Sequence, residues 1–105
     1  MKLRIDKSKV TFTVTKETQN KTDNEGRQRA DRTTGELLFT VQVMALDESG
    51  GEMLTITVAG QPPKVTVGQQ VDPIELEAIP WAQNGRNGVA YRAKELKPLA
   101  GVKAA

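Results

Sequence analysis

The sequence predicts a small all-β domain, and three observations carry this prediction. Short stretches alternate apolar and polar residues, and clusters rich in glycine, asparagine and proline separate them. No segment longer than a turn has the periodicity of a helix. The 105 residues are enough for one domain with its own core and leave no room for a second.

The first three predicted strands have the clearest alternation. Residues 9–16 alternate valine and phenylalanine with threonine, and a run of such β-branched residues favours a strand. Residues 36–46 and 53–59 lie on either side of the polar turn 47–51. We therefore expect these two strands to pair as an antiparallel hairpin.

The last two predicted strands, residues 71–81 and 89–96, flank the cluster Gln-Asn-Gly-Arg-Asn-Gly. Such a cluster between two alternating runs is typical of a β-hairpin. The fourth strand contains Pro73 and Pro80, which cannot donate a hydrogen bond to a neighbouring strand. We therefore expect it to be interrupted, bulged or at the edge of the sheet.

The connection between the first and second strands, residues 17–35, is long and polar. It is interpreted either as an extended β-ribbon that folds back at Gly26 or as a mobile loop. Five strands, two hairpins and this long first connection predict a five-stranded antiparallel Greek-key barrel of the OB type. A small β-sandwich and an SH3-like barrel are the alternatives. Residues 1–98 are expected to form this domain, and residues 99–105 a flexible C-terminal tail.

The composition argues against catalysis. The chain has no cysteine and no histidine, which excludes disulfides, thiol chemistry and Cys/His metal sites. The only serines, Ser8 and Ser49, have no histidine to activate them. We expect a protein that is not an enzyme, with no cofactor, no metal and no small-molecule substrate.

The chain also lacks the sequence marks of export and membrane insertion. Its N-terminal residues have no apolar core of a signal peptide, and no run approaches the roughly 18 apolar residues of a membrane span. The absence of cysteine fits a reducing compartment. We expect a cytoplasmic protein that does not interact with membranes.

Charge is distributed unevenly along the chain. Residues 1–16 and 82–105 together hold ten of the 15 basic residues and two of the 13 acidic ones. If the fold brings the two ends together, a basic face forms that attracts polyanions. The alternative is that these charges are dispersed around a solvated rim.

Nucleic-acid binding is the function that this composition serves best, because basic side chains follow the phosphates while aromatic rings stack on bases. The candidate phosphate contacts are Arg27, Arg29 and Arg32 in the first connection, Arg86 in the last hairpin turn, and Arg92 and Lys94 on the last strand. The candidate stacking residues are Phe39, Trp81 and Tyr91. Core packing is the alternative for Phe39 and Tyr91, which share strand faces with valines, and a plug at one end of the barrel is the alternative for Trp81.

The chain resembles a small family of regulatory proteins from actinobacterial plasmids and integrative conjugative elements. The resemblance covers the whole chain and is strongest in the stretches 31–36, 40–43, 65–68 and 81–93, above all in Asp-Arg-Thr-Thr-Gly-Glu and in Asn-Gly-Val-Ala-Tyr-Arg-Ala. More distantly, the layout is similar to the gene V single-stranded DNA-binding proteins of filamentous phages. That likeness implies an OB-type homodimer with a DNA-binding ribbon, and residues 17–35 would form part of its binding surface.

The sequence thus predicts a protein that binds single-stranded DNA, with RNA as an alternative, largely without sequence preference. It would serve the replication or conjugative transfer of a plasmid or other mobile element, as a homo-oligomer with a dimer favoured. One alternative function is a regulator that binds duplex DNA or mRNA, although no recognition helix is visible. The other is a protein-interaction module that acts through an exposed strand edge and binds no nucleic acid.

Overall fold

The three longest strands form where the sequence alternates most regularly. In the computed structural model, which describes residues 3–4 and 6–99, these are β2 (Thr11–Asn20), β3 (Leu38–Asp47) and β4 (Gly50–Ala59). The strands β3 and β4 pair without a break from Leu38↔Ala59 to Asp47↔Gly50, which confirms the predicted hairpin. Its turn is shorter than expected, because only residues 48–49 lie outside the two strands.

All described strands belong to one mixed sheet, in the order β1-β6-β7-β4-β3-β2-β5-β8. The remaining five are short: β1 (Leu3–Arg4), β5 (Gln70–Ile74), β6 (Glu77–Gln83), β7 (Arg86–Arg92) and β8 (Glu95–Pro98). Only the β4–β7 pair is parallel, through Ile56↔Tyr91 and Thr57↔Arg92. In the part of the chain that the structure describes, no helix is long and apolar enough to cross a membrane.

The all-β prediction is therefore confirmed, whereas the described strands form one open sheet of eight strands and not the predicted five-stranded barrel. The predicted fourth and fifth strands are each divided in two, and the described sheet is open, with β1 and β8 as its outer strands. Glu75, between β5 and β6, has a φ of 52°, in the left-handed region, so the extended chain must turn there. Ala93 and Lys94 separate β7 from β8.

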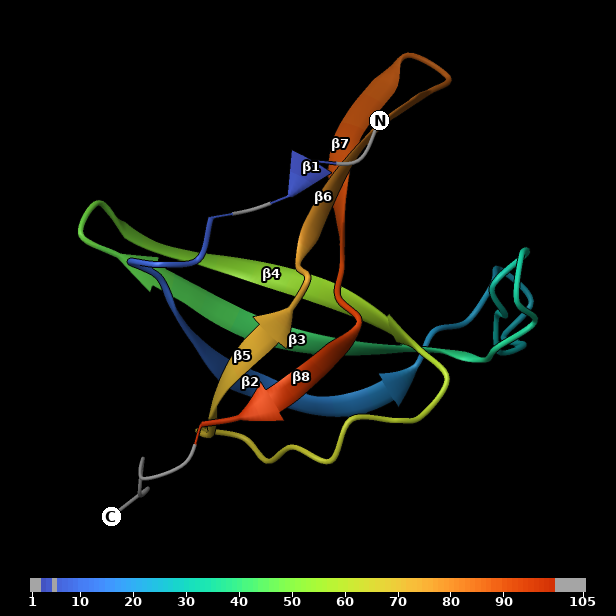
Figure 1. Cartoon of the computed structure of the whole chain (residues 1–105). Helices are drawn as coiled ribbons and strands as arrows, with labels where there is room; N and C mark the ends of the chain where they lie inside the picture. The colour runs from blue at the N-terminus through green and yellow to red at the C-terminus, as the bar shows by residue number, and fades with distance from the viewer. Residues whose placement is uncertain (1–2, 5, 100–105) are drawn as a thin grey trace.

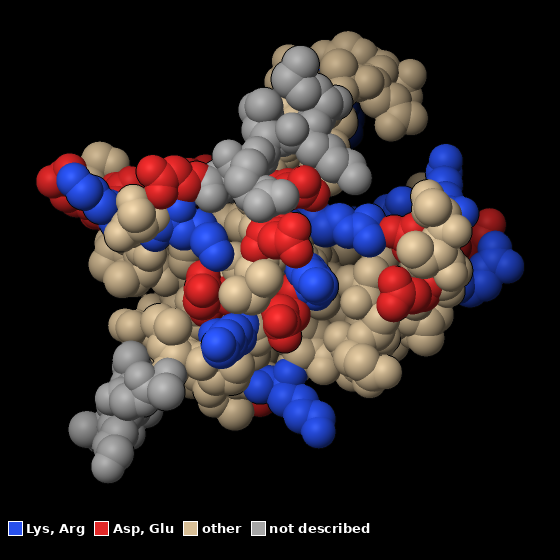
Figure 2. Space-filling view, viewed as in Figure 1, with Lys and Arg blue, Asp and Glu red and all other residues tan. Residues whose placement is uncertain are grey.

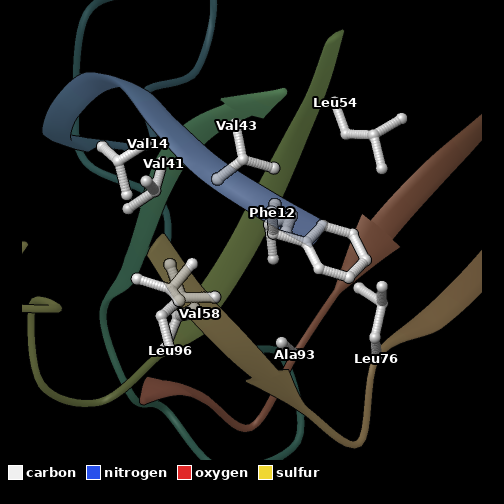
Figure 3. Close-up of a cluster of buried hydrophobic side chains, with 11 residues drawn as sticks. Phe12, Val14, Val41, Val43, Leu54, Val58, Leu76, Ala93 and Leu96 are labelled. Carbon is white, nitrogen blue, oxygen red and sulfur yellow. The ribbon is translucent and has the colours of Figure 1, made fainter. Parts of the chain in front are cut away.

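The core lies between β2–β3–β4 on one side and β5 and β8 on the other (Figure 1, Figure 3). It is built from aliphatic side chains and one phenylalanine: Phe12, Val14, Val41, Val43, Leu54, Ile56, Val58, Val71, Leu76, Ala93 and Leu96. Leu76 follows the turn at Glu75 and is fully buried. The break in the predicted fourth strand thus directs one large side chain into the core.

The strands β6 and β7 form a two-stranded arm, residues 77–92, that projects from the body (Figure 1). Its turn is Asn84-Gly85, with φ of 53° and 76°, the conformation that a two-residue hairpin turn requires. The arm meets β1 and β4 only near its base, through pairs that involve Glu77, Ala78, Tyr91 and Arg92. Among the described residues, its outer part has no neighbouring strand on either side.

The polar connection predicted over residues 17–35 is folded, and its first four residues continue β2 to Asn20. It turns at residues 23–26 and again at residues 31–35, and isolated bridges join Thr22 to Gln28 and Ala30 to Leu37. The chain folds back at Gly26, as the ribbon interpretation predicts. The predicted C-terminal tail lies outside the described residues except for Leu99, whose amide donates to the carbonyl of Gln70.

Replacing the buried residue at the strand break tests this description of the core. We expect Leu76→Ala to lower the free energy of unfolding by about 2–5 kcal/mol, because it removes a fully buried side chain and leaves a cavity. Leu46→Ala is the matched control, since half of the Leu46 side chain is exposed, and it should change stability by less than about 1 kcal/mol. Urea unfolding measures both, and equal losses would contradict the proposed place of Leu76 in the core.

Candidate functional site

The first turn of the polar connection is stabilised by a carboxylate. The side chain of Asp23 accepts hydrogen bonds from the amides of Glu25 and Arg27 at 2.8 and 3.0 Å. The guanidinium of Arg27 pairs in turn with Glu25 and lies 3.8 Å from a carboxylate oxygen of Asp23. Aspartate at the start of a turn commonly bonds to the backbone two residues on, which explains why this polar sequence is ordered.

The second turn repeats this arrangement with Asp31. One oxygen of its carboxylate accepts from the amides of Thr33 and Thr34 at 2.8 and 3.0 Å. The chain closes behind it, because the amide of Asp31 donates to Glu36 and the amide of Gly35 donates to Asp31. The other carboxylate oxygen of Asp31 is thereby directed away from the turn.

That second oxygen binds the arm. The Nη2 atom of Arg92 donates to the Oδ2 atom of Asp31 at 2.6 Å, across 61 residues of sequence. The Asp31 side chain is only 10% exposed. The hydrogen bond from Arg92, followed by those from Thr34 and Thr33, lowers the pKa of Asp31 from 3.8 to about 2. The ion pair fixes the polar connection against the base of the arm.

Lys21 lines the same pocket as this ion pair and, among the described residues, forms no ion pair of its own. The Nζ atom of Lys21 donates to the Oγ1 atom of Thr57 at 3.1 Å, and Thr57 is a buried polar residue on β4. Partial burial lowers the pKa of Lys21, and the charges of Arg29 and Arg92 lower it further. The local potential is therefore positive, which disfavours a further cation and favours an anion.

These groups line one pocket of about 300 Å³ between the polar connection and the arm. Four of its residues are cationic and one is acidic: Lys21, Arg29, Arg32 and Arg92 against Asp31. We call this the basic pocket. Among the described residues, only Arg92 of the four cations forms an ion pair. The uncharged lining includes Leu38, Thr57, Ile79, Ala90 and Tyr91.

The structure brings together four of the residues singled out from the sequence. Arg29, Arg32, Tyr91 and Arg92 all line the basic pocket, although they are 63 positions apart at the extremes. Tyr91 is half-buried and packs against the core, so the predicted alternative of core packing applies to much of its side chain. Figure 2 shows basic side chains, with acidic ones among them, over the polar connection at the right of the view.

Three other predicted residues lie elsewhere. Arg27 is exposed in the first turn, and its charge is paired with Asp23 and Glu25. Phe39 is only 8% exposed, which favours the predicted alternative of core packing over base stacking. Lys94 does not share a strand with Arg92, because it occupies the break between β7 and β8.

The last two predicted residues, Trp81 and Arg86, are exposed on the arm. The prediction that Arg86 lies in the hairpin turn is wrong, because Arg86 is the first residue of β7. Trp81 pairs with Gly88 across the arm, and the side chain of Trp81 is 45% exposed. In the view of Figure 2 the projecting arm is almost free of charged atoms.

Sequence reasoning missed Lys21 and Thr57. Lys21 directly follows β2, and Thr57 is one of several threonines in the alternating pattern of β4, so neither position stands out in the sequence. Only the fold brings the Nζ atom of Lys21 to within 3.1 Å of the Oγ1 atom of Thr57.

A second, larger pocket of about 780 Å³ lies between residues 59–64 and the start of β8. It has two acidic and two basic side chains and so no net charge. Among the described residues, no group of three or more acidic side chains could hold a metal ion.

The Asp31–Arg92 pair predicts a specific pH dependence of stability. Because the pKa of Asp31 in the folded state lies near 2, below its ordinary value of 3.8, ionised Asp31 stabilises the fold above about pH 4. This contribution should be lost as the pH falls toward about 2. Asp31→Asn, which keeps an oxygen for the turn, should remove that part of the pH dependence. NMR titration of the carboxyl carbons and urea unfolding against pH measure it, and an Asp31 pKa near 4 would contradict the pair.

Comparison of the chain with models of protein families, with curated proteins and with solved structures gives no match. The resemblances to proteins of actinobacterial mobile elements and to gene V proteins therefore stay predictions from the sequence.

Proposed function

We propose that this protein binds single-stranded nucleic acid, DNA in the first place, through the phosphates that the basic pocket receives. The observation that carries the proposal is the convergence of Lys21, Arg29, Arg32 and Arg92 on one pocket with a single carboxylate. Phosphate oxygens form strong charge-assisted hydrogen bonds with guanidinium and ammonium groups. Binding of this kind depends on charge and not on base sequence.

The state of Lys21 supports an anionic ligand. Its ammonium group is partly buried and lies within the field of Arg29 and Arg92, and its one described hydrogen-bond partner is the neutral hydroxyl of Thr57. A phosphate in the pocket would offset the mutual repulsion of these cations. The pocket wall supplies the hydroxyl of Thr57 as a further polar group near the anion.

The separation of the cations favours a polyanion over a small anion. Arg92 and Arg86 lie six residues apart on β7, which corresponds to about 20 Å along an extended strand. Positions separated by an even number share one face of a strand, so both side chains belong to the same side of the arm. A chain of phosphates can reach from the basic pocket toward the outer end of the arm, whereas one phosphate cannot.

The strand pairing is compatible with the predicted OB-type barrel, which we propose as the parent architecture. If β5 and β6 are two parts of a fourth strand, and β7 and β8 two parts of a fifth, the pairs β2–β3, β3–β4, β4–β7, β7–β6 and β5–β2 form a closed cycle. In this interpretation the polar connection joins strands one and two, and the outer end of the arm, with its turn at Asn84-Gly85, joins strands four and five. In OB folds these two connections bind oligonucleotides.

A regulator of duplex DNA is a second candidate, because the major groove admits a two-stranded β-ribbon and the arm is such a ribbon. The single-strand proposal is preferred because Trp81 is exposed on the arm and could stack on unpaired bases. Homodimerisation, a cytoplasmic location and a role in plasmid replication or transfer are parts of the proposal that rest on the sequence resemblances alone.

Neutralising two arginines of the pocket tests the proposal. We expect the double variant Arg29→Gln with Arg32→Gln to bind single-stranded DNA about tenfold or more weakly at low salt. Loss of two phosphate contacts should also reduce the slope of log affinity against log salt by about 1.4, since each contact contributes about 0.7 for single strands. Arg92 is left unchanged, because replacing it would also break the ion pair with Asp31. Fluorescence anisotropy of an end-labelled strand of mixed sequence measures both effects.

Arg27→Gln is the matched control, because Arg27 belongs to the same connection, is exposed and lies outside the basic pocket. It should change the affinity by less than about twofold. An equal loss in the control would show that the charge of the whole connection matters and not the pocket. Tighter binding of duplex than of single strands would favour the regulator, and no binding of either at low salt would refute nucleic-acid binding.

A further inference from the structure

The Trp81 side chain is held in a fixed relation to the strand beside it. A Cβ atom added to Gly88 would lie 2.7 Å from Cζ2, 2.9 Å from Cε2 and 3.1 Å from Nε1 of Trp81. The indole therefore lies directly over the backbone of Gly88, closer than any other residue type at position 88 would allow. Because the Trp81 side chain is 45% exposed, the ring surface turned away from Gly88 is open to solvent.

The space that the Trp81 indole occupies explains why residue 88 is a glycine, whereas the backbone conformation of residue 88 does not. The φ of Gly88 does not lie in the left-handed region that glycine alone adopts readily, unlike the φ of Gly85 in the turn. Any residue could adopt the backbone conformation of a strand at position 88. The absence of a side chain serves to make room for the indole.

The ring lies on the side of the arm that leads from the basic pocket. Ile79 and Ala90, which are paired with each other, line that pocket. The next pair on the same side is Trp81 with Gly88, two residues further along each strand, or about 7 Å. Beyond it lies Arg86, opposite Gln83. One side of the arm thus presents a cationic pocket, an uncovered indole and an arginine in sequence.

We propose that Gly88 holds the Trp81 indole against the arm as a platform on which an unpaired base stacks, while neighbouring phosphates bind the basic pocket and Arg86. The inference rests on the proposed function and adds a contact to bases. A ring already fixed on one side loses little freedom when a base covers the other, which favours binding. Bases within a duplex are stacked on one another and cannot use the platform, so it selects single strands.

Trp81 is the only tryptophan of the chain, so its fluorescence reports on the platform directly. We would titrate the full chain with oligo-dT and with an abasic strand of the same length, which has the same phosphates and no bases. Stacking should quench the Trp81 emission with oligo-dT and leave it almost unchanged with the abasic strand. Anisotropy of end-labelled strands measures affinity separately in the same solutions.

Three variants separate the platform from the charge. Trp81→Ala should weaken binding of oligo-dT by about 5- to 150-fold, the range for loss of one stacked base, and leave the abasic strand unaffected. Gly88→Val should displace the indole and produce the same selective loss. Val89→Thr is the matched control on the opposite side of the arm, and it should change neither affinity. Should Gly88→Val fail to fold, as judged by circular dichroism, Gly88→Ala introduces the same clash with a smaller side chain.

The outcomes distinguish this inference from the proposed function. Salt-dependent binding of oligo-dT without quenching, or with full affinity in Trp81→Ala, would overturn the platform and leave binding through the pocket intact. Equal losses for oligo-dT and the abasic strand in Gly88→Val would also overturn it, because the glycine would then act on the arm as a whole. Absence of binding to either strand by the unmodified protein would refute the proposed function itself.

Discussion

The turn of the chain at Glu75 and the matching break at Ala93 and Lys94 determine where the candidate site lies. Each of these two breaks divides a stretch that the sequence predicts as one strand into two strands with different positions in the fold. The strands β5 and β8 cover the core, whereas β6 and β7 leave the body and project as the arm. Leu76 and Ala93, which are buried at the two breaks, anchor both changes of direction in the core. The position of the arm therefore depends on the packing beneath it.

The base of the arm is also where the polar connection is held. Such a connection, with few apolar side chains, cannot be positioned by burial and needs directional bonds instead. Asp31 supplies them in both directions, to the turn amides of Thr33 and Thr34 and to the guanidinium of Arg92. One consequence is that Arg29 and Arg32, which flank Asp31 in sequence, are carried to the same place as Lys21. The position of Asp31 therefore accounts both for the ion pair with Arg92 and for the gathering of cations in the basic pocket.

The sequence predicts the parts of this architecture that follow from local patterns. Alternating residues predict β2, β3 and β4, and the cluster Gln-Asn-Gly-Arg-Asn-Gly predicts the hairpin of the arm, because period-two burial and turn residues leave signals within a few residues. The cluster does not show that the turn itself takes only Asn84-Gly85. Proline at positions 73 and 80 correctly indicates an irregular fourth strand. The sequence does not show which of the allowed irregularities occurs, nor that the fifth strand also breaks, because these depend on how β5 and β8 pack. For the same reason Lys94, expected beside Arg92 on one strand face, lies outside β7, in the break before β8.

The candidate site shows a comparable division. Residue type alone identifies Arg29, Arg32 and Arg92, because long cationic side chains are the usual phosphate ligands. Arg27 is also an arginine of the polar connection, but it lies outside the basic pocket. Its ion pairs with Asp23 and Glu25 form only in the folded turn, so the sequence does not distinguish it from Arg29 and Arg32. Lys21 and Thr57 acquire their place from the fold, 36 residues apart in sequence. Trp81 is apparent in the sequence as the single tryptophan, but its partner is a glycine whose importance appears only when the ring is seen to occupy the space of its missing side chain. Residue type therefore identifies candidate cations, whereas the place of Lys21 beside Thr57 and of the Trp81 indole over Gly88 depends on the fold and becomes visible only in the structure.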